Sequence, residues 1–173
     1  MKTALLGLIV LVAGAWFFAP WFAFQDMRSA AAVGDAAGVE AVVDFPALRA
    51  SLRPQVEALV AAPGAAPAHP AARPWWLPSF IPLPDRNPVS EVIGGFDREA
   101  RVVRRVNVLA SPAGLAGLAR GRAWVRDWGM SRFRIDVRPP GAAKAAAPTT
   151  FTFSRHGLYD WKLVHVRLGA GVG

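Results

Sequence analysis

Very few side chains in this sequence have the type and spacing that catalysis requires. The three histidines are His69, His156 and His165, and none has a second histidine four residues away, as a helical zinc site needs. Ser154, His156 and Asp160 form the one combination that resembles a serine-hydrolase triad. They fall in a predicted hairpin turn, and no nucleophile elbow of the hydrolase type surrounds the serine. We therefore interpret all three as turn residues.

Other reactive groups are equally sparse. Asp35 and Asp44 each precede a helical pattern, so we interpret them as helix N-caps and not as a carboxylate pair. The chain contains no cysteine, which excludes disulfides and thiolate metal sites. It also contains no glycine-rich phosphate loop. The sequence therefore predicts a protein that is not an enzyme and that holds no cofactor and no metal.

The residues best suited to contact a partner are aromatic or basic, and they lie in two regions. A proline-rich loop at 63–88 has an apolar centre, and a predicted helix at 89–110 carries arginines on one side. Apolar patches and basic faces are typical of contact surfaces. Both features also have structural explanations, since the loop can pack on the domain and the arginines can simply be solvated. The candidate membrane or partner contacts are Trp75, Trp76, Phe80, Ile81, Arg98, Arg101 and Arg105.

The formal net charge of +8 narrows the class of partner. The positive residues are spread along the chain, and no helix-turn-helix, zinc-finger or RNA-binding signature accompanies them. The sequence therefore predicts no nucleic-acid binding. An envelope protein or an anionic lipid surface is the expected partner for the basic face.

The stretch from Ala4 to Phe24 contains no charged side chain, and as a helix it would be about 30 Å long, enough to cross a bilayer. We expect residues 1–24 to form a transmembrane signal-anchor helix that contacts the lipid bilayer through residues 4–24. A cleaved secretory signal is the alternative, but aromatic residues continue past the cleavage-like Ala13-Gly14-Ala15. The positive-inside rule then predicts a single-pass protein of the bacterial inner membrane with its domain in the periplasm.

Residues 25–173 are expected to form one α+β domain. Helices are predicted at 25–60 and 86–120, with a kink or break near Arg53 because Pro54 follows it. Apolar residues that include Phe96 and Val103 recur at helical spacing in the second region. Alternating residues then predict a three-stranded antiparallel meander at Arg132–Arg138, Thr149–Arg155 and Trp161–Leu168, covered by the helices on one face. The expected core residues of that sheet are Phe133, Ile135, Phe151, Phe153, Trp161 and Val164.

Four segments occur in an order that resembles a bacterial family. They are the apolar N-terminus, the helical segment RSAAAVGDAAGVEAVVDFPALRASL, the segment VLASPAGLAGLARG and the terminal hairpin FTFSRHGLYDWKLVHVRL. Together they resemble the family catalogued as domain of unknown function 2939, over most of the chain except the proline-rich loop. The resemblance implies no known activity and no catalytic residues.

The sequence therefore leads to a functional hypothesis without a reaction. An apolar anchor, a small α+β domain and basic and aromatic surfaces indicate a membrane-anchored, non-enzymatic bacterial envelope protein that binds a protein or another envelope component. The alternative is a small-ligand or lipid carrier with an apolar pocket between the helices and the sheet, since such sites are concave and largely preformed.

Overall fold

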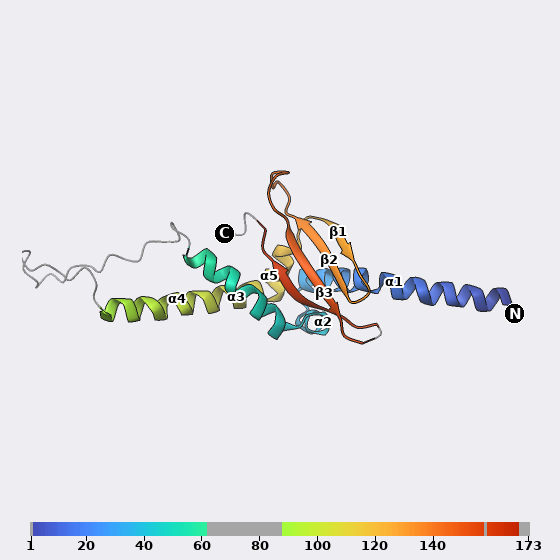
Figure 1. The fold of residues 1–173 in the computed structure, drawn as a ribbon, viewed down its shortest axis with the longest axis horizontal. Coiled ribbons are helices and arrows are strands. Elements are labelled where there is room, and N and C mark those ends of the chain that lie inside the picture. Colours follow the sequence, from blue (N-terminus) through green and yellow to red (C-terminus); the bar gives the residue numbers. More distant parts are fainter. Residues whose placement is uncertain (1, 62–87, 158, 170–173) are drawn as a thin grey trace, which may run out of the picture.

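The computed structural model describes residues 2–61, 88–157 and 159–169, and within them a helical half precedes a β half (Figure 1). This order confirms the predicted α+β class. The helices are α1 (Lys2–Val33), α2 (Ala36–Val42), α3 (Phe45–Ala61), α4 (Pro88–Leu109) and α5 (Pro112–Leu118). The strands are β1 (Arg122–Trp128), β2 (Arg132–Arg138), β3 (Thr149–Arg155) and β4 (Trp161–Arg167).

The sheet has four antiparallel strands in the order β1-β2-β3-β4, so the prediction of three strands is wrong. The structure confirms the bounds of β2 and β3, and β4 ends one residue earlier than predicted. β1 escaped prediction because its sequence, RAWVRDW, does not alternate cleanly. Its pairing with β2 shifts between Val125 and Asp127, which makes Arg126 the extra residue of a β-bulge. A bulge breaks the period of two on which sequence recognition of a strand depends.

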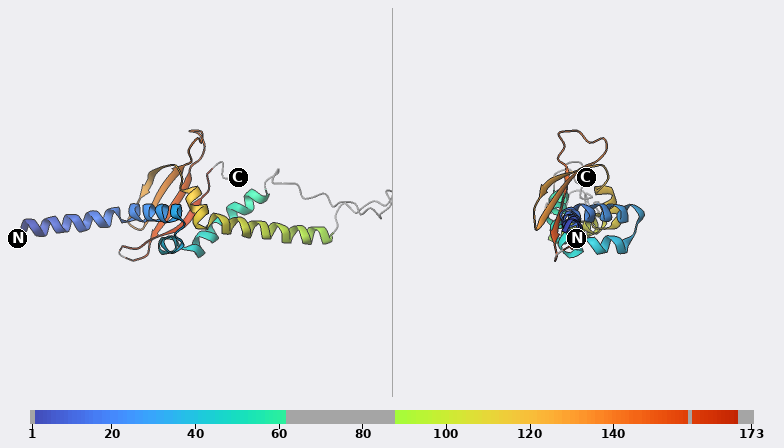
Figure 2. Two further views of the ribbon diagram at one scale, coloured as in Figure 1. Left: turned by 180° about the vertical axis from the view of Figure 1, so that it is seen from behind. Right: turned by 90° about the vertical axis from the view of Figure 1, so that its right-hand side faces the viewer.

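The core lies between the helices and one face of the sheet. Phe133 pairs with Phe153, and Ile135 pairs with Phe151, so four large side chains stand on the same face. Phe24 of α1 packs on them with its ring centroid 5.9 Å from that of Phe151, and all five side chains are fully buried. Figure 2 shows the helices gathered on this side of the sheet, which leaves the other face uncovered.

Val164 is not part of this core, contrary to prediction. The register between β3 and β4 shifts at Thr152 and Phe153, whose partners are His165 and Leu163. Val164 is the extra residue of this second bulge and is only half-buried on the outer side. Leu163 and Val166 point inward in its place and are fully buried.

The predicted transmembrane helix is also wrong. No helix within the described residues is both long enough and apolar enough to cross a membrane. α1 continues without interruption to Val33, and Ala23, Phe24 and Met27 are buried in the domain. Packing on the sheet therefore accounts for the apolar side chains at the end of the predicted span.

The helix boundaries follow the predicted caps. The Oδ1 of Asp35 accepts a hydrogen bond from the Gly38 N–H at 3.0 Å, and the Oδ1 of Asp44 accepts one from the Ala47 N–H at 3.0 Å. Of the kink or break predicted near Arg53, the break does not occur, because α3 continues through Pro54. An internal proline costs roughly 3 kcal/mol, and we attribute the tolerance to the buried apolar stripe of α3. That stripe consists of Leu48, Leu52 and Val56.

α3 also covers the outer edge of β4. The side-chain amide of Gln55 donates to the Val166 carbonyl at 2.7 Å and accepts from the Leu168 N–H at 2.8 Å. Just before α3, the Asp44 N–H donates to the Leu163 carbonyl at 3.0 Å. These bonds satisfy strand groups that would otherwise face solvent, so β1 forms the one edge of the described sheet without such a cover.

Candidate binding surface on the open face of the sheet

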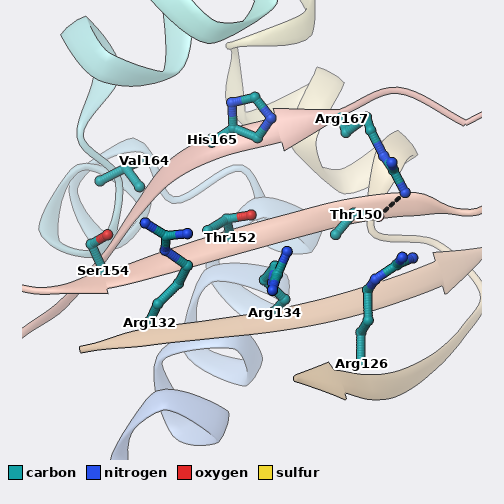
Figure 3. A pocket seen from close by; sticks show the side chains of 9 residues that line it. All are labelled: Arg126, Arg132, Arg134, Thr150, Thr152, Ser154, Val164, His165 and Arg167. Carbon is teal, nitrogen blue, oxygen red and sulfur yellow. Dashed lines mark hydrogen bonds between the residues drawn. The ribbon is translucent and has the colours of Figure 1, made fainter. Parts of the chain in front are cut away.

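The uncovered face of the sheet carries a basic hollow of about 410 Å³ (Figure 3). Residues on this face alternate with the core residues of the same strands, as the register of β2, β3 and β4 requires. Figure 3 shows four arginines, from β1, β2 and β4, around a row of hydroxyl side chains on β3. The lining residues are Arg126, Arg132, Arg134, Thr150, Thr152, Ser154, Val164, His165 and Arg167.

A polar chain crosses all four strands at one end of this hollow. Arg126 on β1 donates through Nη1 to the Oδ2 of Asp136 on β2 at 3.1 Å. The hydroxyl of Thr150 on β3 donates to the Oδ1 of the same carboxylate at 2.7 Å, and Arg167 on β4 donates to that hydroxyl at 3.3 Å. Asp136 and Thr150 are buried. Buried and hydrogen-bonded polar groups hold their geometry, so this chain fixes two of the four arginines.

The other two arginines differ in how their charges are balanced. Arg134 donates through both Nε and Nη2 to the Oδ2 of Asp127, at 3.2 and 2.8 Å. Arg132, two residues earlier on the same strand, has no hydrogen-bond or ion-pair partner among the described residues and is exposed. Two carboxylates therefore face four guanidinium groups, and the hollow retains a net positive charge.

His165 lies on the same face beside Arg167. Partial burial lowers the pKa of its imidazole, and the positive charge of Arg167 lowers it further. The ring is therefore predominantly neutral at neutral pH. An anion bound between the two side chains would favour the protonated ring, so His165 can report on occupancy of the hollow.

The arrangement is suited to holding an anion. Guanidinium groups form paired hydrogen bonds with carboxylates and phosphates, and the hydroxyls of Thr152 and Ser154 add neutral donors. No hydrogen bond among the described residues joins the side chains of Ser154, His156 and Asp160 into a triad. His156 and Asp160 are joined by a main-chain hydrogen bond, from the His156 N–H to the Asp160 carbonyl at 2.7 Å, which closes the β3–β4 turn. The described residues also contain no group of three potential metal ligands.

The contact residues expected from the sequence lie elsewhere. Trp75, Trp76, Phe80 and Ile81 fall outside the described residues. Arg98, Arg101 and Arg105 are exposed on α4, whose buried residues among those described are Val102 and Val106. The structure thus places this basic helix face away from the hollow. The alternation of charged residues along β2 was the available signal for the open sheet face, but it does not reveal that β1 and β4 contribute arginines beside it.

The chain matches the model of a protein family over part of its length. The model of a family described as "Protein of unknown function (DUF2939)" matches residues 9–80, which confirms the predicted resemblance over that region. The match begins within α1, includes α2 and α3, and stops before the sheet begins. No curated protein and no solved structure matches the chain.

Proposed function

We propose that this protein is a non-enzymatic binding module that takes up an acidic segment of a partner protein on the open face of its sheet. The observation that carries the proposal is the set of four arginines around an uncovered hollow, one of which has no described partner. An exposed guanidinium beside neutral hydroxyl donors attracts carboxylates and steers their approach.

The spacing of the arginines favours an extended protein segment. Arg132 and Arg134 are two residues apart on β2 and on the same face, so their backbones are about 7 Å apart. Acidic residues at alternate positions of an extended segment have the same repeat. The pairing of Arg134 with Asp127 supports the proposal, because it is a carboxylate held by an arginine of this surface.

Fluorescence anisotropy with the full chain and two labelled peptides tests the proposal. One peptide alternates Glu and Thr, and its control alternates Gln and Thr. We expect binding of the acidic peptide only, with an affinity that falls as salt rises. Arg132→Gln should weaken this binding about fivefold or more, because the side chain with no internal partner is the one free to pair with the peptide.

Arg104→Gln is the matched control, because it removes one exposed arginine from α4 without touching the sheet. The two variants have the same net charge. If both variants weakened peptide binding equally, the peptide would be responding only to the overall charge, and the proposal would fail. Binding of polyphosphate but not of the acidic peptide would replace the protein partner by a phosphate-bearing one.

Location in the bacterial envelope stays a prediction. Its support is the sequence Met1-Lys2-Thr3 followed by an apolar run, a pattern that export signals share. A C-terminal fusion to alkaline phosphatase tests it, since the enzyme is active only outside the cytoplasm. A fluorescent fusion to green fluorescent protein, with an inactive phosphatase fusion, would move the search for a partner to the cytoplasm.

A further inference from the structure

A second cavity, of about 260 Å³, lies on the opposite side of the sheet from the basic hollow. It is walled by α1, by the β1–β2 turn and by the ends of β3 and β4. Its volume is near the lower end of the range for small-molecule sites, about 300 Å³. Aromatic side chains dominate its lining, which consists of Trp16, Phe17, Trp128, Gly129, Met130, Arg155 and Trp161.

Arg155 is the charged residue of this cavity. Its guanidinium carbon lies 4.3 Å from the ring centroid of Trp16 and 5.1 Å from that of Trp161, so two indole rings hold it by cation–π attraction. Neither an ion pair nor a side-chain hydrogen bond of Arg155 occurs among the described residues. A positive charge among aromatic walls is weakly screened, so it attracts an anion more strongly than a solvated arginine does.

Two donors in the cavity wall, one of them on Arg155 itself, have no acceptor among the described residues. The Nε of Arg155 and the Nε1 of Trp161 are buried without a hydrogen-bond partner among the described residues. Buried donors are nearly always paired in proteins, because an unpaired one is costly. Both side chains line the cavity, so an acceptor bound there is the partner nearest to hand once the side chains rotate toward it.

The remaining wall favours a flat, apolar body. The rings of Phe17 and Trp128 stack at 4.6 Å with an interplanar angle of 10°, and the Trp128 ring also meets Phe133 edge-to-face at 4.7 Å. Phe17 is half exposed and Met130 largely exposed, so both stand at the rim where a ligand would enter. Aromatic rings stack favourably on such surfaces.

We propose that this cavity binds a small aromatic carboxylic acid, with its carboxylate on Arg155 and Trp161 and its ring against Trp128. The carboxylate and the ring of the ligand are inferred from separate observations. The carboxylate supplies the acceptor that the guanidinium and the indole N–H lack, and the ring packs on the aromatic side chains that dominate the lining. The site is independent of the acidic-peptide surface, which lies on the other face of the sheet.

Titration of the full chain with benzoate, benzamide and acetate, followed by two-dimensional NMR of the indole N–H groups, tests the proposal. Benzamide keeps the ring without the charge, and acetate keeps the charge without the ring. We expect benzoate to shift the Trp161 signal with a Kd of about 1 mM. Both analogues should bind at least tenfold more weakly. Equal binding of benzamide, or no shift with benzoate, would overturn the proposal without recourse to any variant.

Variants then locate the site. Arg155→Gln should weaken benzoate at least tenfold, and Trp161→Phe, which removes only the N–H, about threefold. Arg138→Gln is the matched control, because Arg138 also lies over an indole, that of Trp124, at 5.2 Å, and also has a buried unpaired Nε. If Arg155→Gln lowers the melting temperature, Arg155→Lys, which keeps the charge, is measured beside it. Benzoate binding that Arg155→Gln and Trp161→Phe leave unchanged, or that Arg138→Gln weakens equally, would place the ligand elsewhere and refute the assignment.

Discussion

At the scale of single residues, the two faces of each strand have opposite functions. Phe151 is fully buried against Phe24, whereas its neighbour Thr152 lines the open hollow. One side of the strand supplies the apolar area that stabilises the fold, and the other supplies the polar groups available to a partner. Substitutions one position apart should therefore affect different properties.

Phe151→Ala is expected to lower the free energy of unfolding by about 3–5 kcal/mol, the usual cost of emptying a buried phenylalanine site. Urea denaturation followed by circular dichroism measures the loss. Thr152→Ala is the control, since it shortens a side chain on the outer face and should leave stability nearly unchanged. A loss below about 1 kcal/mol for Phe151→Ala would mean that its face is not the packed one.

His165 gives a pH-dependent prediction whose sign follows from its lowered pKa. As the pH falls through the ordinary histidine value of about 6.5, the unfolded chain takes up a proton before the folded chain does. Stability should therefore decline between pH 6.5 and the lower pKa of the folded state. Thermal melting of the native chain and of His165→Asn across this range provides the measurement. The variant should lose less stability, and identical pH profiles would contradict the prediction.

At the scale of elements, the two central strands were predictable from the sequence, whereas the edge strand β1 and the inward face of β4 were not. β2 and β3 follow from strict alternation in RFRIDVR and TTFTFSR. β1 and the inward face of β4 did not, because bulges at Arg126 and Val164 interrupt the period. A bulge depends on the neighbouring strand, so the local sequence does not reveal it.

The helices were predictable at their ends but not on their faces. Asp35 and Asp44 act as the predicted caps through bonds of 3.0 Å to the N–H groups of Gly38 and Ala47. On α4 the predicted apolar stripe included Phe96 and Val103, yet both are exposed and Val102 and Val106 are buried. Spacing indicates that an apolar face exists, but the position of α3 and α5 decides which one is covered.

The candidate sites were the least predictable part. The hollow brings together residues from Arg126 to Arg167, and the aromatic cavity joins Trp16 to Trp161. Each depends on contacts between distant segments, which residue spacing cannot encode.

Gln55 leads to a prediction about the edge of the sheet. Its amide bonds the Val166 carbonyl and the Leu168 N–H, so Gln55→Ala should leave both groups unpaired and cost about 1–3 kcal/mol. Hydrogen exchange at the Leu168 amide should accelerate in the variant. Glu57→Ala, on the exposed side of the same helix, is the control and should leave that exchange rate unchanged. Equal rates in all three proteins would mean that Gln55 does not hold this edge.

At the scale of the whole molecule, α1 belongs to the folded domain. Its residues Ala23, Phe24 and Met27 are buried among side chains of the sheet and of the other helices. The N-terminal part of α1 extends beyond the sheet (Figure 1). The boundary of the domain therefore falls within the helix and not at its end.

Two truncations test this boundary. A chain that begins at Trp16 keeps the residues of α1 that are described as buried, whereas one that begins at Gln25 loses Ala23 and Phe24. Because Phe24 alone contributes on the order of 3–5 kcal/mol, the shorter chain should melt about 10 °C lower or more. Differential scanning calorimetry makes the comparison. Equal melting temperatures would show that residues 16–24 are dispensable for folding.

The unequal edges of the sheet have a consequence for self-association. Unpaired strand edges allow sheets to extend from molecule to molecule, and an extension that leaves a new free edge each time grows into a fibre. Here Gln55 and Asp44 occupy the edge of β4, while β1 carries no such cover among the described residues. Two copies that join through β1 would expose only sealed edges, so growth would terminate at a two-fold symmetric pair.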